Sequence, residues 1–349
     1  MVIKNIRAEE MEVKMEVFDN IAISSRIRLA RNVDGLKFYT KLQSDEDANY
    51  IICSIMKTLE ENGSYSFLCL KNLSLNECNA LFEQHLISKE LIENKDISAV
   101  AISEDEKVVV MINEEDHIRE QCLEKGFNLY KPYRRILEID KAILNAMPIA
   151  FSEKYGFITA SPSNLGSGMR ASVMLFLPAH YYLGKIDEVV AKAKEEGLTI
   201  RGCYGEGSRA LGQYYQISNQ SSLGLDENEI IDKVSDFIYK LCIEEKEQRE
   251  YLLENDFAKY KDMCLRAYGT ITNCYTLTSG EMVELLSLVK FAQVLGFVDI
   301  INEDKFQKLF HEGGEANLKE IFELNDKKEE NILRAEYISN KVKEFTVRR

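Results

Sequence analysis

The sequence Lys107-Val-Val-Val-Met-Ile-Asn-Glu-Glu-Asp-His-Ile-Arg119 joins a short apolar run to a charged turn. Its first half, residues 107–112, is rich in β-branched residues and predicts a buried strand. Three consecutive acids, a histidine and an arginine follow at the point where this strand leaves the core. Taken alone, residues 113–119 fit either a solvated acidic turn or one part of a functional site, and the rest of the chain decides between them.

Length and composition limit the possible folds and partners. The chain has 349 residues, of which 45% are hydrophobic, so it can form one large or two moderate domains with a sizeable core. Its 44 basic and 58 acidic residues give a formal net charge of −14. This charge argues against nucleic acid and membranes as partners and allows attraction to basic protein substrates.

The eight cysteines contain no C-x-x-C pair, and the four histidines form no zinc-binding pattern. The sequence therefore predicts no metal site of its own. The first residues lack the apolar region of a signal peptide, and no uninterrupted apolar run approaches the length of a membrane span. We therefore expect a reduced, cytoplasmic protein.

Residues 21–32 begin apolar and then alternate apolar residues with arginine, which predicts a strand. Arg26 and Arg28 lie two residues apart, so on a strand both project from the same face. Two guanidinium groups on one face repel unless an anion lies between them, and a polyphosphate suits their geometry. The alternative is a pair of surface arginines that form ion pairs with the many carboxylates.

The remaining pattern predicts a mixture of helices and strands. A polar turn joins two antiparallel strands, residues 99–103 and 107–112. Two loops rich in glycine, within residues 158–177 and 198–220, are each flanked by strands. Helices are expected at residues 45–63, 76–85, 118–130, 133–146, 186–197, 227–254, 278–295, 317–324 and 329–345. We place a domain boundary near residue 245, which divides the chain into residues 1–245 and 246–349.

The two glycine-rich loops carry further charged residues. The first contains Gly166 and Gly168, which allow close approach of a ligand, and it leads to Arg170. It is not a Walker loop, because G-x-x-x-x-G-K-[ST] occurs nowhere in the chain. The second loop has Glu206 at its centre and fits either a segment that closes over a substrate or a plain mobile hairpin.

Charged residues from these separate segments form a plausible constellation for phosphoryl transfer. Five arginines lie at predicted strand ends or loop edges, and two glutamates are presented separately. Arginines can hold an ATP polyphosphate, and carboxylates can hold a cationic acceptor. The five arginines are Arg26, Arg28, Arg119, Arg170 and Arg201.

Four motifs in order resemble those of the phosphagen (ATP:guanido) kinases, the family of the creatine and arginine kinases. They are Ser24-Ser-Arg-Ile-Arg28, residues 113–119, Ser161-Pro-Ser-Asn-Leu-Gly-Ser-Gly-Met-Arg170 and Arg201-Gly-Cys-Tyr-Gly-Glu206. Three further stretches, starting at Arg26, Arg170 and Ile217, are similar to the bacterial protein arginine kinase branch. The resemblance implies an α+β fold, in which an antiparallel sheet flanked by helices precedes an all-helical C-terminal domain.

The resemblance also implies roles for individual residues. Glu115 and Glu206 are the catalytic pair that holds the acceptor guanidinium. The five arginines bind the phosphates of ATP together with Mg²⁺, and Ser24 and His85 are nucleotide contacts, although His85 fits a helix-end histidine equally well. Glu114 and Asp116 orient the loop or the waters of the metal ion, and His117 receives no chemical role.

Three positions depart from the family pattern. Ser161 replaces the reactive cysteine, and Gln216 replaces an aspartate expected at the end of the second glycine-rich loop. In the C-terminal part, the branch carries an R-D-x-x-R-A element that recognises phosphoarginine. The matching stretch here, residues 330–335, keeps only Arg334 and Ala335, so Arg334 belongs either to a phosphoarginine site or to an ordinary amphipathic helix.

These observations predict an ATP-dependent protein arginine kinase, which marks proteins with exposed arginine for Clp-type degradation or controls a stress repressor. The helical domain that precedes the first motif in metazoan relatives is not found before Ser24, which favours a protein acceptor. An activator protein, Clp protease components and a homodimer are the other partners that the resemblance suggests. The alternatives are a kinase of free arginine or another small guanidine, and a non-catalytic phosphoarginine or protease adaptor.

Overall fold

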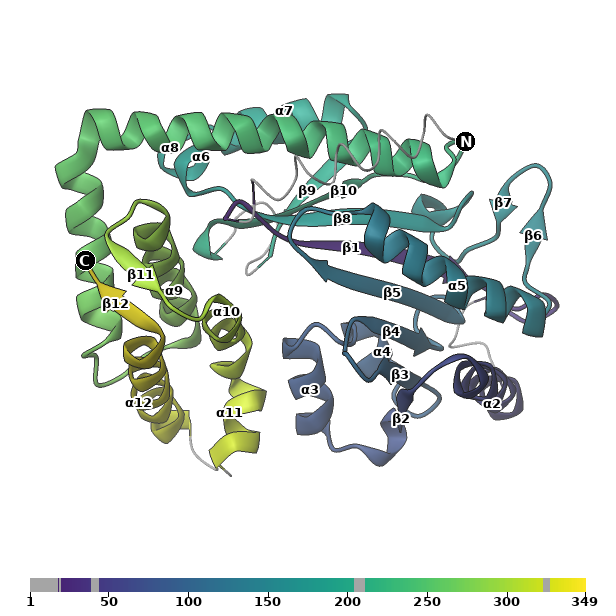
Figure 1. Ribbon diagram of the computed structural model, residues 1–349. Helices are drawn as coiled ribbons and strands as arrows, with labels where there is room; N and C mark the ends of the chain where they lie inside the picture. Colours follow the sequence, from purple (N-terminus) through teal and green to yellow (C-terminus); the bar gives the residue numbers. More distant parts are fainter. Residues whose placement is uncertain (1–17, 19, 39–43, 204–210, 323–326) are drawn as a thin grey trace.

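Strand β1 (Ala22–Arg31) lies near the centre of an eight-stranded antiparallel sheet with the order β2-β3-β4-β5-β1-β8-β10-β9 (Figure 1). The computed structural model describes residues 18, 20–38, 44–203, 211–322 and 327–349. The other strands of this sheet are β2 (Tyr65–Cys69), β3 (Ala99–Ser103), β4 (Val108–Ile112), β5 (Ile118–Lys125), β8 (Met169–Phe176), β9 (Leu198–Gly202) and β10 (Tyr214–Asn219). The predicted hairpin of residues 99–112 is confirmed as β3 and β4.

One face of the sheet is covered by helices that the sequence predicts. Apolar residues at alternate positions of β1, such as Ile27 and Leu29, are buried in the large core on this face. The covering helices, which lie above and in front of the sheet or at its lower right edge in Figure 1, are α2 (Asp45–Asn62), α5 (Tyr130–Ala146), α7 (Ile186–Glu195) and the first half of α8 (Glu227–Ile271). This layer holds β1 in place and turns its arginines toward the opposite face.

The opposite face is covered at its β2–β4 end by α3 (Leu75–Glu83) and α4 (Lys89–Glu93). Cys78 of α3 and Leu91 of α4 are fully buried in a smaller core against Val100 and Met111 of the sheet. Burial of a side chain such as Leu91 contributes about 1.5–3 kcal/mol. This small core fixes α4 beside the end of β4, where the charged turn begins.

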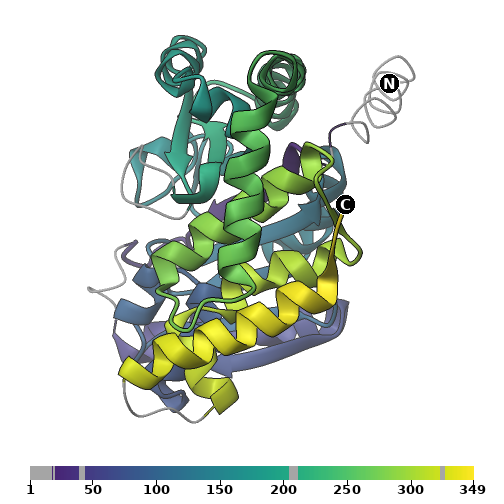
Figure 2. The same ribbon diagram turned by 90° about the vertical axis from the view of Figure 1, so that its left-hand side faces the viewer.

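Helix α8 connects the sheet to the C-terminal helices. It runs without a break through residue 245 and leaves helical geometry at Asp256, where φ is −135°. The C-terminal helices are α9 (Ser279–Val294), α10 (Glu303–Glu312), α11 (Glu315–Phe322) and α12 (Lys327–Phe345), which face the viewer in Figure 2. The boundary near residue 245 therefore falls inside a continuous helix, and it stays a prediction.

The structure corrects two expectations. Residues 118–125 form strand β5, where the sequence pattern predicts a helix, because pairing with both β1 and β4 overrides the local pattern of charges. The C-terminal part is mostly helical, but it also contains a strand pair, β11 (Val298–Ile300) with β12 (Thr346–Arg348). These strands are too short to show a period in the sequence.

Among the described helices, none has the length and apolar composition of a membrane span.

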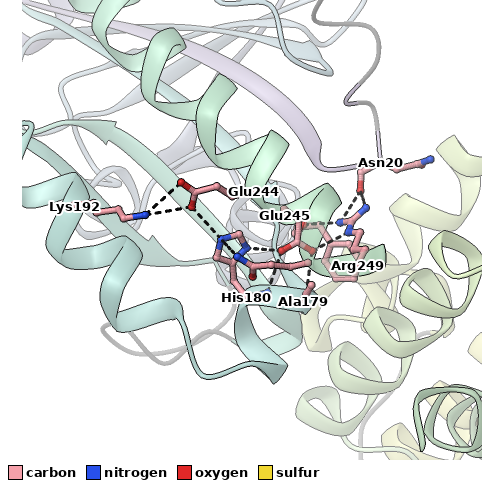
Figure 3. A network of polar contacts seen from close by, with 9 residues as sticks. Asn20, Ala179, His180, Lys192, Glu244, Glu245 and Arg249 are labelled. Carbon is pink, nitrogen blue, oxygen red and sulfur yellow. Dashed lines mark hydrogen bonds and ion pairs between the residues drawn. The ribbon is translucent and has the colours of Figure 1, made fainter. Parts of the chain in front are cut away.

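A buried polar network fastens α8 to the end of β8 and to the short helix α6 (Pro178–Tyr182) (Figure 3). The Glu245 carboxylate accepts hydrogen bonds from the backbone nitrogens of Ala179 (3.0 Å) and His180 (3.1 Å) and from the His180 ring (2.6 Å). Arg249 donates to the same carboxylate at 2.8 Å and to Phe176 O at 3.0 Å. Burial raises the pKa of Glu245, but Arg249 and His180 outweigh it and leave the pKa below its usual value.

We expect Glu245→Gln to lower the free energy of unfolding by about 3 kcal/mol, because the change leaves Arg249 buried without its carboxylate. Urea denaturation at pH 7 measures this loss. Since the pKa of Glu245 is lowered in the folded state, the loss should shrink as the pH falls through that pKa. Glu247→Gln is the control, because Glu247 is an exposed glutamate on the same helix and takes no part in this network. Equal stability of the two variants would contradict the prediction.

A second set of contacts joins the C-terminal helices to α3, which lies beside α11 in Figure 1. Glu83 at the end of α3 accepts hydrogen bonds from the backbone nitrogens of Ala316 (2.9 Å) and Asn317 (3.0 Å) in the first turn of α11. The rings of His85 and His311 lie edge to face, with centroids 4.9 Å apart. The C-terminal helices are thus fixed against the part of the sheet that carries α3 and α4.

Candidate active site

The strand register brings the five predicted arginines to one face of the sheet. The predicted strand is confirmed as β1, so Arg26 and Arg28 share a face, and Arg28 lies directly opposite Arg170 of β8 on that face. Arg119 pairs with Ala30, and Arg201 pairs with Gln216, so both belong to the same face. Segments that are far apart in the sequence therefore present positive charge to one region.

A cavity of about 410 Å³ lies over this region. Four of its lining arginines come from the sheet face, namely Arg28, Arg119, Arg170 and Arg201. Four carboxylates from the β4–β5 turn and from α4 also line it, namely Glu90, Glu114, Glu115 and Asp116. We call the first group the arginine floor and the second group the acidic wall.

Arg26 lies beside the arginine floor on the same face of the sheet without lining the cavity, and Arg26 and the floor together carry positive charge that the protein does not fully compensate. Burial, Arg119 and Arg170 lower the pKa of Arg26 to about 10, and burial together with Arg26, Arg119 and Arg170 places the pKa of Arg28 well below its usual value. The Nε atoms of Arg26 and Arg28 are buried without a hydrogen-bond partner among the described residues. Such a group of cations is suited to an anion with several oxygens.

Arg170 and Gln216 show how the β8–β10 side of the floor is held. Arg170 donates to the Ser218 hydroxyl from Nε (3.2 Å) and Nη2 (2.9 Å), and burial together with Arg201 and Arg119 lowers its pKa to about 10. Gln216, where the resemblance leads us to expect an aspartate, donates to Ser172 Oγ at 3.0 Å. It lines the cavity as a neutral residue, so it adds no negative charge to the floor.

The turn between β4 and β5 positions the acidic wall. Asn113 has a positive φ of 61° and donates to Ile97 O at 2.8 Å, which starts the tight turn. Glu114 is buried and pairs with Arg119, while Asp116 accepts hydrogen bonds from Asn32 Nδ2 and Ala160 N, both at 2.6 Å. The carboxylate of the middle acid, Glu115, remains exposed in the cavity.

Glu115 therefore differs from its two neighbours. Its side chain makes no ion pair among the described residues, whereas Glu114 and Asp116 are committed to partners inside the protein. Partial burial, Asp116 and Glu114 raise the pKa of Glu115, and Arg119 opposes this effect. A carboxylate with a raised pKa and no internal partner can bind a cation and accept a proton.

His117, at the end of this turn, is a structural residue. It is fully buried; its Nδ1 accepts from Val33 N at 3.0 Å, and its Nε2 lies 2.8 Å from Lys37 O. These contacts set the neutral tautomer, with the proton on Nε2, and burial lowers the pKa of the ring. The geometry agrees with the absence of a chemical role for His117.

The first glycine-rich loop forms another part of the cavity. Ser161, Ser163, Asn164 and Gly168 line it, and the Ser161 and Ser163 hydroxyls lie 2.9 Å apart. Gly168 has a φ of +72°, and a Cβ at this position would lie 2.7 Å from Ala30 O, so only glycine fits beside β1. Residue 161 therefore offers a hydroxyl in the position where the resemblance places a thiol.

The other predicted site residues lie elsewhere. Ser24 is two residues from Arg26 on the sheet face and does not line the cavity; neither does His85, which follows α3 beside His311. Burial, His311 and Arg26 lower the pKa of His85 to about 3. The second catalytic glutamate of the prediction, Glu206, lies outside the described residues.

Arg334 lies in the interior of the C-terminal part. It is 1% exposed and donates to Gly313 O (2.7 Å), Leu277 O (3.1 Å) and Asn331 Oδ1 (2.6 Å), and it also pairs with Glu330. These contacts favour the amphipathic-helix interpretation of residues 330–335 over a phosphoarginine site. The guanidinium ties α12 to the loops before α9 and α11.

Sequence reasoning missed three cavity residues. Glu90 belongs to α4, a helix of five residues that shows no period in the sequence, Ser88 caps this helix, and Ser218 lies on β10. The signal for Ser218 was its place in the stretch starting at Ile217, which resembles the protein arginine kinase branch. No cluster of three or more potential metal ligands occurs among the residues that the structure describes.

Two family models match the chain. The model described as the ATP:guanido phosphotransferase C-terminal catalytic domain matches residues 47–248. The model described as the Protein-arginine kinase McsB C-terminal domain matches residues 258–349. Together they cover the C-terminal helices and the sheet with its helices, except for strand β1 and the first residues of α2.

Similar proteins and solved structures agree with these two family models. A protein-arginine kinase of Clostridium acetobutylicum is 40% identical over 92% of this chain and 95% of that protein. A protein-arginine kinase of Geobacillus kaustophilus is 37% identical over 83% of this chain and 81% of that protein. The taurocyamine kinase of Schistosoma mansoni with bound transition-state-analogue components has a TM-score of 0.58 and 30% identity over 65% of this chain and 33% of that chain. A lombricine kinase has a TM-score of 0.56 and 26% identity over 65% of this chain and 67% of that chain.

Proposed function

This chain belongs to the ATP:guanido phosphotransferase family, and we propose that it transfers the γ-phosphoryl group of ATP to arginine side chains of proteins. The observation that carries the proposal is the two-sided cavity. The arginine floor suits the polyphosphate of ATP, and the acidic wall suits a cationic acceptor. One cavity thus offers complementary charge to both substrates of a guanidino kinase.

The proposed reaction assigns distinct tasks to the two sides. Arg28, Arg119 and Arg170 hold the phosphates in line with the acceptor and offset the charge that develops on the transferred group. A guanidinium nitrogen attacks the γ-phosphorus, so that an N–P bond forms as the bond from the γ-phosphorus to the β–γ bridging oxygen breaks and ADP leaves. Because a guanidinium is protonated and weakly nucleophilic, Glu115 orients it and accepts the proton that nitrogen loses.

Mg²⁺ enters this scheme with ATP. This ion keeps several of its waters and is bound through substrate phosphates and one or two carboxylates, so no dedicated protein cage is required. Glu114 and Asp116 are committed to Arg119, Asn32 and Ala160, which suits them to orienting the turn. Glu206 is proposed as the second acceptor-binding carboxylate on the resemblance alone.

The test incubates the protein with Mg²⁺ and ATP, and either an arginine-rich protein or free arginine. We expect acid-labile phosphoarginine on the protein, detected by mass spectrometry under conditions that preserve N–P bonds, and little turnover of free arginine. Robust turnover of free arginine with no product on protein would instead identify a small-guanidine kinase. Binding of phosphoarginine without any transfer would favour an adaptor.

Several aspects of the proposed role rest on the resemblance alone. They are the cytoplasmic location, a homodimer, an activator protein and the link to Clp-type proteolysis or a stress repressor. Arg334, with its donors directed to Gly313, Leu277 and Glu330, does not support a phosphoarginine site in the C-terminal part. The proposed activity therefore centres on the cavity over the sheet.

A further inference from the structure

The acidic wall includes a carboxylate that belongs to none of the four motifs. Glu90 lies on α4 and lines the same cavity as Glu115, together with Ser88, the residue that caps this helix. Its neighbours on α4, Lys89 and Glu93, do not line the cavity. Glu90 is therefore the one charged residue of this helix that faces the site.

The position of Glu90 is fixed by three contacts of its helix. Leu91 is fully buried in the core beneath β3 and β4, and its carbonyl accepts a hydrogen bond from Ser98 Oγ at 3.0 Å. Asn94, at the end of α4, donates from Nδ2 to Glu114 O at 3.0 Å. The helix is thus fastened both to the sheet and to the turn between β4 and β5, which holds Glu90 in the same cavity as Glu115.

Charge on the wall is unevenly compensated. Glu114 pairs with Arg119, and Asp116 is hydrogen-bonded within the protein. Glu90 and Glu115 make no ion pair among the described residues, and Glu90 adds to the repulsion that raises the pKa of Glu115. Two carboxylates that share a cavity without an internal partner attract positive charge from an acceptor. When the target guanidinium pairs with Glu115, the Glu90 carboxylate remains available to pair with a second cation.

We propose that Glu90 is a specificity-determining residue, which recognises a basic side chain next to the target arginine in the acceptor protein. The inference rests on the proposed function and names its substrate class, namely protein segments in which the target arginine is flanked by lysine or arginine. Glu90 takes no part in bond making. It lowers the KM for such segments by pairing with the flanking cation at the margin of the cavity.

The test compares two short peptides, which have one arginine each and carry either lysine or glutamine at both flanking positions. For the wild-type protein we expect a KM about 3-fold to 5-fold lower for the lysine peptide, with equal kcat, as for one solvent-accessible ion pair. Glu90→Gln should remove this preference, and Glu90→Lys should reverse it. The preference should also weaken as the salt concentration rises toward 1 M.

Glu93→Gln is the matched control, because Glu93 is an exposed glutamate on the same helix and should leave the preference unchanged. If Glu90→Gln raises the KM of both peptides equally, or changes neither, the inference is overturned while the proposed function stands. If the wild-type protein forms no phosphoarginine on either peptide, the proposed function itself fails. A purely structural role of Glu90 would change kcat or thermal stability without any dependence on the flanking residue.

Discussion

Glu115→Gln is expected to lower kcat for arginine phosphorylation by about 10²–10⁴-fold, the range in which general base catalysis contributes. The glutamine keeps the size of the side chain but can neither hold a guanidinium by charge nor accept its proton. Glu115 is exposed in the cavity and is not needed to anchor the turn, so the variant should fold and bind ATP normally. Steady-state assays on an arginine-rich protein measure the loss.

The pH profile gives a sharper test of the same residue. Because partial burial, Asp116 and Glu114 raise the pKa of Glu115, the acidic limb of kcat/KM for the wild-type protein should lie above the usual range of a glutamate. The rate falls as the pH drops through this pKa, since the protonated carboxyl cannot accept a proton. The residual activity of Glu115→Gln should lack this limb. An unchanged limb, or kcat within 3-fold of wild type, would remove Glu115 from the chemical step.

Local periodicity predicts the parts of the site that lie on one strand. The alternation around Arg26 and Arg28 indicates a common face, and this holds because side chains alternate strictly along a strand. The convergence of Arg28 and Arg170 depends on the antiparallel register of β1 and β8, which residues from two distant segments determine together. Only the family resemblance, with four motifs in order, could predict that convergence from the sequence.

Other parts of the site could not be predicted because tertiary contacts decide them. The segment of Arg119 has charges at helical spacing, yet it pairs on both sides and becomes β5. Glu90 lies on a helix too short for a periodic signal, and tertiary contacts such as those of Leu91, Ser98 and Asn94 fix its place. Arg334 matches a recognition motif in sequence, but its donors are directed into the protein. A matching residue type therefore does not establish that a side chain is available to a ligand.

The arginine floor has a cost in the absence of nucleotide. Arg28 lies opposite Arg170 across the ladder, and its Nε has no hydrogen-bond partner among the described residues. Like charges directly opposite each other on a sheet destabilise it, by up to about 1 kcal/mol. Burial, and after it repulsion from Arg26, Arg119 and Arg170, lowers the pKa of Arg28. Folding therefore disfavours the protonated form of Arg28, and the folded protein is less stable wherever this residue stays protonated. This penalty is therefore present throughout the neutral pH range.

Arg28→Gln should consequently lower the activity while it raises the stability of the unliganded protein. We expect kcat/KM to fall by about 10³–10⁵-fold, as for other arginines that offset charge on a transferred phosphoryl group. The unliganded variant should be more stable than wild type by about 1 kcal/mol, measured by urea denaturation. Saturating Mg²⁺ and ATP at 100 times Kd should stabilise wild type by about 2.7 kcal/mol and the variant far less.

Arg266→Gln removes one positive charge from an exposed position on α8, where the side chain is 78% exposed, and it serves as the control. It should change neither the activity nor the response to ATP, which separates the local effect of Arg28 from the change in net charge. If Arg28→Gln is more stable than wild type and is no longer stabilised by ATP, then binding of the phosphates relieves the repulsion among the arginines of the unliganded cavity. A variant that is less stable than wild type and still responds fully to ATP would contradict this, because Arg28 would then be a structural residue. The repulsion among the arginines is in this view the reason that the floor binds a polyanion strongly.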